Sequence, residues 1–157
     1  MLENPAPLMR AVTSDCSTRP DFTGAWKLIP GESDFAFLAP PRLRIDTVIH
    51  EGCCLRIQTR QKDANGDLTV VRDLIIGEEA SQVIIRGRRR SIRAFWDDTA
   101  LVVETISEVS GKGRRIRDRW ALAEDAERLV IERRYEQPGG AVNQRLVLRR
   151  VQRNVDQ

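Results

Sequence analysis

Polar and apolar residues alternate along this chain in short runs, and a turn signal ends each run. Successive side chains of a β-strand point to opposite faces, so this alternation predicts strands with one buried face. Turn residues separate the runs, for example at Asn65-Gly66, Asp97-Asp98, Gly111-Lys112-Gly113 and Pro138-Gly139-Gly140. The pattern predicts strands near residues 22–29, 42–50, 53–62, 67–76, 82–87, 91–96, 100–109, 115–123, 128–136 and 141–151.

No stretch of the chain sustains a helical period, and one helical turn is expected at residues 31–35. Strands joined by short turns pair as antiparallel hairpins, so the sequence predicts an all-β, antiparallel up-and-down barrel of about 8–10 strands. We expect residues 1–20 to form a flexible N-terminal arm, residues 21–152 the barrel domain, and residues 153–157 a C-terminal tail.

Composition narrows the classes of function. The apolar runs are too short to span a bilayer, and residues 1–21 lack the apolar core of a signal peptide, so we expect a cytoplasmic protein without a membrane partner. Three cysteines, of which Cys53 and Cys54 are adjacent, make a poor disulfide framework. With one histidine besides, the ligands for a metal are too few. We expect no metal and no cofactor.

The alternation also assigns an inner face to the last strands of the barrel. Placing Leu122 opposite Leu129 across the turn at 124–127 sets Asp118 against Arg133 inside the barrel. A buried charge is costly unless it is paired, so this pair is either a sealed structural contact or the polar handle of a pocket.

The neighbouring hairpins extend this polar contact into a row. Pairing Tyr135 with Val142 puts Gln144 beside Arg133, and pairing Val109 with Ile116 puts Ser107 beside Asp118. The predicted inward row is Ser107, Asp118, Arg133 and Gln144.

The segment 21–28, which contains Gly24-Ala25-Trp26, resembles the opening strand of lipocalin-like (calycin) barrels, whose hallmark is Gly-x-Trp. The stretch 24–35 is similar to that of a group of bacterial lipocalin-like proteins. This resemblance implies a barrel with a central cavity for an apolar ligand. It also implies that Trp26 packs at the closed end under Arg149 or Arg150. Ten strands would look more like nitrobindin or the fatty-acid-binding proteins than like an eight-stranded lipocalin.

Pockets combine apolar walls with a few convergent polar groups, and the predicted interior contains both. Arg72 is a second inward cation, placed opposite Thr59, and Phe35 and Phe37 lie on a loop that would cover or plug the barrel mouth. His50, at a strand end, is expected on the outer face. The residues expected to line a ligand site are Arg72, Trp96, Thr105, Ser107, Asp118, Trp120, Arg133, Tyr135, Gln144, Phe35 and Phe37.

Three functions remain open from the sequence. The first is binding of a small, largely apolar or amphipathic molecule whose polar end Arg133 and Asp118 orient. The second is a cofactor-free cyclase, isomerase or lyase, with Asp118 or Tyr135 as acid–base and Arg133 stabilising an oxyanion. The third is nucleic-acid or protein interaction through outer arginines at 86–90, which offer only Phe95 for stacking and which we rank last. A gap between strands would permit a homodimer.

Overall fold

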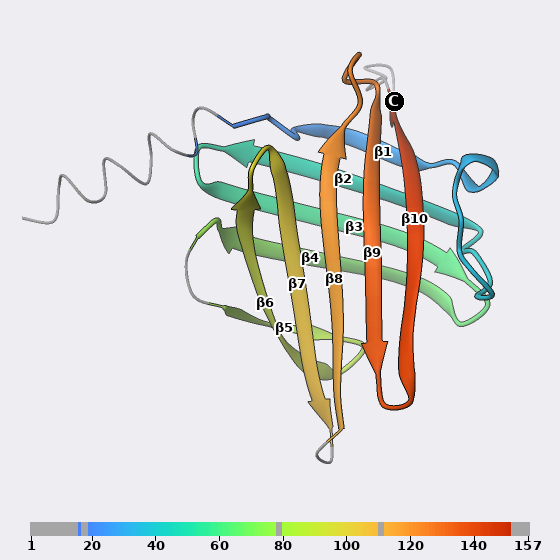
Figure 1. The fold of residues 1–157 in the computed structure, drawn as a ribbon. Coiled ribbons are helices and arrows are strands. Elements are labelled where there is room, and N and C mark those ends of the chain that lie inside the picture. The colour runs from blue at the N-terminus through green and yellow to red at the C-terminus, as the bar shows by residue number, and fades with distance from the viewer. Residues whose placement is uncertain (1–15, 17–18, 78–79, 110–111, 152–157) are drawn as a thin grey trace, which may run out of the picture.

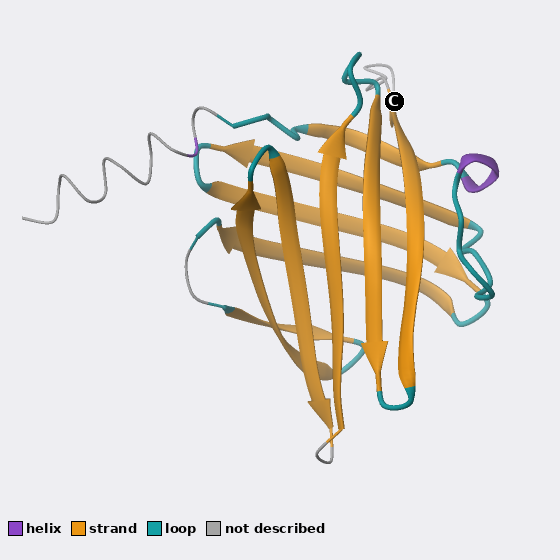
Figure 2. Cartoon of the chain, in the orientation of Figure 1, coloured by secondary structure: helices purple, strands orange, loops and turns teal. Residues whose placement is uncertain are grey.

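The computed structural model describes residues 16, 19–77, 80–109 and 112–151, which form one ten-stranded antiparallel sheet. The predicted all-β, up-and-down barrel is therefore confirmed, with each strand within a few residues of its expected place (Figures 1 and 2). The elements are β1 (Gly24–Leu28), the 3₁₀ turn η1 (Pro30–Glu32), β2 (Leu43–Glu51), β3 (Cys54–Asp63), β4 (Gly66–Ile75), β5 (Ser81–Ile85), β6 (Arg88–Asp97), β7 (Ala100–Val109), β8 (Lys112–Leu122), β9 (Arg128–Gln137) and β10 (Gly140–Val151). None of the described residues form a helix long and apolar enough to cross a bilayer.

The sheet runs in the order β4-β3-β2-β1-β10-β9-β8-β7-β6-β5 and curls until its two edges approach each other. In Figure 1, β6–β10 stand upright in front of β2–β4, which cross behind them at a steep angle. This is the orthogonal packing of a strongly twisted sheet folded over one core. Strands β4 and β5 are the two edges, and no ladder joins them, so the barrel is nearly rather than fully closed.

The turns decide the register of each hairpin. Between β5 and β6, Arg86 and Gly87 both have positive φ, 52° and 78°, as a two-residue turn that follows the strand twist requires. Between β8 and β9 and between β9 and β10, the predicted registers are confirmed, with Asp118 opposite Arg133 and Arg133 opposite Gln144.

Two predicted registers are wrong because the turns are tighter or earlier than expected. Strand β8 starts three residues after β7 ends, so Val103 and not Ser107 lies opposite Asp118. Strand β4 starts at Gly66, so Arg72 lies opposite Ile57 and not Thr59. Both shifts are by an even number of residues, which keeps every side chain on its predicted face.

The N-terminal segment closes one end of the barrel. Phe22 is fully buried, and its ring packs edge-on to Trp120 with the centroids 5.7 Å apart. Cys16 forms a disulfide with Cys53, at a Cα–Cα distance of 5.2 Å, so the expectation of no disulfide is wrong. The sequence argument failed because it considered only cysteine number and adjacency, whereas folding brings Cys16 back over the start of β3.

The Gly-x-Trp motif has a steric reason in this fold. The guanidinium of Arg150 covers the ring of Trp26, with Cζ 4.3 Å from the centroid, and donates to the carbonyl of Thr23 at 3.0 Å. The expected partner of Trp26 is therefore Arg150. A Cβ atom on Gly24 would lie 2.5 Å from Nη1 of Arg150, so only glycine leaves room for this stacked cation.

We expect Gly24→Ala to lower the free energy of unfolding by about 1–3 kcal/mol, because it combines this clash with a φ of +151°. Gly31→Ala is the matched control, since nothing lies within 4 Å of the added methyl group. Urea denaturation of both variants measures the difference. Equal stability of the two variants would contradict the steric role of Gly24.

Candidate functional site: the barrel interior

One wall of the barrel interior carries an ion pair between β8 and β9. Nε and Nη2 of Arg133 donate to the two carboxylate oxygens of Asp118, at 2.8 and 2.9 Å. Burial alone would raise the pKa of Asp118, but the charge and hydrogen bonds of Arg133 outweigh it and lower that pKa. Asp118 is therefore held ionised with both oxygens occupied, an arrangement that favours a binding or structural role over acid–base catalysis.

A second polar cluster lies on β2, β3 and β4. Asp46 accepts from Nε of Arg44 at 3.1 Å and from the hydroxyl of Thr59 at 2.6 Å. Nη2 of Arg72 donates to the same hydroxyl at 2.9 Å. The sequence analysis anticipated only Arg72 here. Arg44 and Asp46 were missed although both alternate in phase with the buried residues of β2.

The two clusters face each other across the interior. Burial lowers the pKa of Arg72, and that pKa responds to Asp46 and Arg44 on its own wall and to Asp118 and Arg133 on the other. Such coupling requires the charges to be close and poorly screened by water. The clusters therefore form one electrostatic unit in the barrel, built from strands that are far apart in the sequence.

Some inward side chains near the polar clusters are only partly covered. Arg133 points inward and is ion-paired, yet its side chain keeps 20 % of its surface accessible. Tyr135, Arg72 and Arg90 also occupy inward positions and are only half-buried. These inward side chains are therefore less completely covered than the apolar core residues.

Four buried side-chain nitrogens in the described part of the chain have no hydrogen-bond partner: Nε of Arg72, Nε of Arg90, and the indole nitrogens of Trp96 and Trp120. All four are N–H donors at inward positions, and no described buried acceptor is left unpaired. Buried donors are normally satisfied by protein, water or a ligand. The protein by itself therefore leaves the hydrogen-bonding capacity of these four buried donors unused.

The remaining predicted site residues divide into two groups. Thr105, Ser107 and Gln144 are inward and buried, and the side-chain amide of Gln144 donates to the carbonyl of Phe35 at 3.1 Å. Phe35 packs against the core, while Phe37 is 78 % exposed and does not plug the barrel. Of the two phenylalanines, only Phe35 therefore contacts the barrel core.

His50 is at the closed end and not on the outer face, where the sequence placed it. Its side chain is 3 % exposed, and Nδ1 accepts from the backbone N–H of Phe22 at 3.3 Å. The carboxylate of Asp21 lies 3.8 Å from the same nitrogen. The inward phase of Arg44, Asp46 and Val48 would have identified this position, because His50 continues it.

Burial lowers the pKa of His50 below its usual 6.5, although Asp21 acts in the opposite direction. As the pH falls, His50 is therefore protonated at a higher pH in the unfolded chain than in the folded one. We expect the folded state to lose stability below about pH 6.5. His50→Gln, which keeps an acceptor for Phe22, should remove this dependence, since the chain has one histidine. Thermal unfolding at pH 7 and pH 5 measures the effect. Unchanged wild-type stability between these two values would contradict it.

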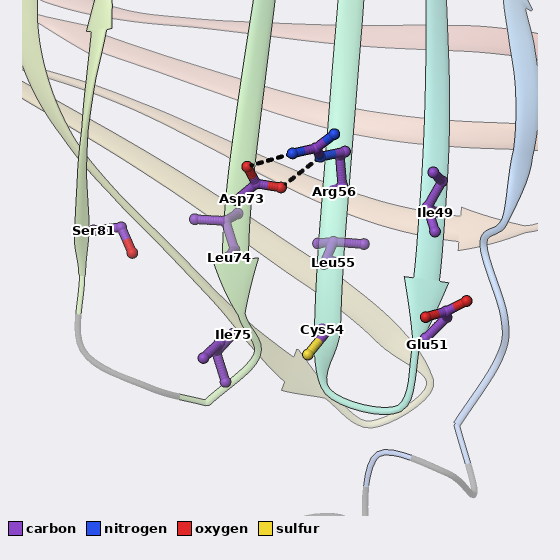
Figure 3. Close-up of a pocket in the computed structure, with 9 residues that line it drawn as sticks. All are labelled: Ile49, Glu51, Cys54, Leu55, Arg56, Asp73, Leu74, Ile75 and Ser81. Atoms are coloured by element: carbon purple, nitrogen blue, oxygen red, sulfur yellow. Dashed lines mark hydrogen bonds and ion pairs between the residues drawn. The ribbon is translucent and has the colours of Figure 1, made fainter.

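A groove of about 550 Å³ lies on the outer surface, across the ends of β2, β3 and β4 (Figure 3). Ile49 and Ile75, at 48 % and 52 % exposure, contribute its apolar part. Two of its three charged residues, Arg56 and Asp73, satisfy each other through two hydrogen bonds at 2.7 and 3.1 Å, and the third, Glu51, is exposed. Because none of the described buried, unpaired donors belongs to the groove, the interior is the stronger candidate site.

The outer arginine cluster at 86–90 is only partly engaged within the protein, since Arg88 and Arg89 are exposed. Arg86 lies 3.7 Å from the carboxylate of Asp63, and Arg90 points inward. The ring of Phe95 is covered by Arg93 and Arg117, whose Cζ atoms are 4.8 and 5.7 Å from its centroid. The stacking platform that nucleic-acid binding would need is therefore already occupied.

Comparison with known proteins identifies the fold. No protein-family model matches the chain, and neither does any curated protein. Among solved structures, a secretory abundant heat soluble protein from Ramazzottius varieornatus matches with a TM-score of 0.61 and 10 % identity over 82 % of this chain and 94 % of that chain. Zebrafish ileal bile acid-binding protein complexed with cholic acid matches with a TM-score of 0.57 and 12 % identity, over 83 % of this chain and 98 % of that chain. The REP1-NXSQ fatty acid transporter matches with a TM-score of 0.58 and 13 % identity, over 84 % of this chain and 97 % of that chain. The fold is a ten-stranded antiparallel barrel similar to those of the matched structures; identities this low show the fold alone.

Proposed function

We propose that this protein binds a small, largely apolar molecule inside the barrel, with a hydrogen-bond acceptor at the polar end of that molecule. The observation that carries the proposal is the set of four buried, inward N–H donors without partners. An apolar wall of Leu, Ile and Val side chains surrounds them. A ligand with an acceptor would satisfy donors whose desolvation the protein's own groups leave uncompensated.

The matching structures support the same class of ligand. Two of them are named for a bile acid and a fatty acid, both of which join an apolar body to a polar end. In this chain the apolar and polar parts of the interior are likewise separated. Aromatic rings close one end, and the charged clusters lie further along the strands.

The experiment is a binding screen by native mass spectrometry and thermal shift, with fatty acids, bile acids and their neutral analogues. A tryptophan at Thr105 would fill the interior, while Ile106→Trp adds the same side chain to the outer face of the same strand. We expect Thr105→Trp to abolish ligand stabilisation and Ile106→Trp to retain it. Circular dichroism checks that each variant is folded. If Thr105→Trp does not fold, Ser107→Leu takes its place as the interior variant. Equal binding by folded interior and outer variants would place the site outside the barrel.

A further inference from the structure

Residues 19–23 cross one end of the barrel before the chain enters β1 (Figure 1). The backbone N–H of Arg19 donates to the carbonyl of Cys16 at 3.2 Å, and Cys16 is joined by the disulfide to Cys53, in the turn between β2 and β3. The guanidinium of Arg19 donates to the carbonyl of Asp98, in the turn between β6 and β7. Residues 19–23, which we call the strap, therefore connect turns from opposite halves of the sheet.

The strap is anchored at its ends rather than along its length. Cys16 is 4 % exposed and Phe22 is fully buried. Between these two anchors, the described residues Arg19 and Pro20 are half-buried and Asp21 is exposed. A segment with few buried contacts opens locally at a low free energy. The disulfide at Cys16 is therefore one of the two anchors that hold the strap against the barrel, and the packing of Phe22 is the other.

The two halves of the disulfide differ in accessibility. Cys53 is only partly buried, whereas Cys16 is almost fully covered. The turn that carries Cys53 is also held by the barrel, since the carbonyl of Cys53 accepts from the backbone N–H of Ile76 at 2.8 Å. For a thiolate in solution, Cys53 is therefore the more accessible half, with Cys16 as the leaving group.

The strap covers an aromatic side chain at this end of the barrel. Cζ of Arg19 lies 5.6 Å from the ring centroid of Trp96, and the ring of Phe22 stacks on Trp96 with the centroids 6.2 Å apart. Trp96 is half-buried, at an inward position near the end of β6. Movement of the strap away from the barrel would therefore uncover Trp96.

We propose that the Cys16–Cys53 disulfide is a redox-sensitive latch on this end of the barrel, opened by a dithiol reductant that attacks Cys53. A thiolate of the reductant forms a mixed disulfide with Sγ of Cys53 and displaces the Cys16 thiolate, which takes up a proton. The second thiol of the reductant displaces the Cys53 thiolate, which is protonated in turn, and the reductant leaves as its own disulfide. The strap then detaches from Trp96 while the ladders of the sheet stay intact, with or without a ligand in the barrel.

Hydrogen exchange measured by mass spectrometry tests the latch. Cys54→Ser is the background, because the two cysteines of the disulfide are then the only ones in the chain. On reduction with dithiothreitol we expect exchange in the strap to accelerate at least about tenfold, while exchange in β9 stays within about twofold. Quenching of tryptophan fluorescence by acrylamide should rise as well, because Trp96 is uncovered while Trp26 and Trp120 remain in the core.

Arg133→Met is the control for a general loss of stability, because it breaks a buried ion pair and leaves the disulfide in place. It should show no acceleration confined to the strap. An unchanged strap after reduction would overturn the inference, and so would an equal acceleration in β9. A reduced chain that circular dichroism shows to be unfolded as a whole would also overturn it, since the disulfide would then hold the entire barrel.

The direction of attack is tested by a short pulse of reduced glutathione, stopped with excess iodoacetamide, again on Cys54→Ser. We expect peptide mass spectrometry to find glutathione on Cys53 and the alkyl group on Cys16. This readout does not require the fully reduced chain to stay folded. Glutathione on Cys16, or an even division between the two cysteines, would contradict attack at Cys53.

Discussion

Replacing Arg133 by methionine is expected to lower the free energy of unfolding by about 3 kcal/mol, which is roughly 6–12 °C in Tm for a chain of this size. The variant leaves Asp118, at 5 % exposure, with neither of its two charge-assisted hydrogen bonds. Breaking a buried pair on one side costs more than the pair contributes, because the remaining charge is desolvated and unpaired. Urea denaturation at pH 7 measures the loss.

The double variant is the control for this prediction. Asp118→Asn together with Arg133→Met removes both charges and should recover about half of the lost stability or more. The pKa of Asp118 is lowered in the folded wild type, so the contribution of the pair is complete above the usual 3.8 and is lost as the pH falls further. The gap between wild type and Arg133→Met should therefore narrow in acid. A single variant as stable as the wild type at pH 7 would show that Asp118 does not depend on Arg133.

Loss of the disulfide should have an effect of similar size. Cys16 lies 37 positions before Cys53, and closing a loop of that length restricts the unfolded chain by about 4 kcal/mol as an upper value. We expect Cys16→Ser to lose about 2–4 kcal/mol, because the covalent tie also holds the segment that leads to Phe22 over the barrel end. Chemical denaturation with and without a thiol reductant measures it.

Cys54→Ser is the matched control, since Cys54 is exposed and outside the disulfide. Its stability should stay within about 0.5 kcal/mol of the wild type and should still fall on reduction. Wild type that is insensitive to reductant, or Cys16→Ser that equals wild type under oxidising conditions, would contradict the prediction. The cytoplasmic location expected from the sequence stays a prediction.

The sequence by itself determined the strands, the inner and outer faces of β7 to β10, and one internal ion pair, although it misplaced His50 at the end of β2. Alternation is a local property, and a turn of known length sets the register of the hairpin next to it, as between β8 and β9. Where the turn length was misjudged, as between β7 and β8, the partner of Asp118 changed but its face did not. The face of a side chain is thus a more robust prediction than its neighbour.

Only the tertiary structure decided which residues meet across the barrel. Arg72 and Arg133 are on walls built by different hairpins, and no local pattern measures the distance between them. The same is true of Cys16 and Cys53, and of His50 and Phe22, which come together because the chain returns over the closed end. Whether a cation is free or paired depends on these long-range contacts. The sequence therefore predicts Arg133 as the group that orients a ligand. The structure shows Arg133 paired with Asp118, and Nε of Arg72 without a hydrogen-bond partner.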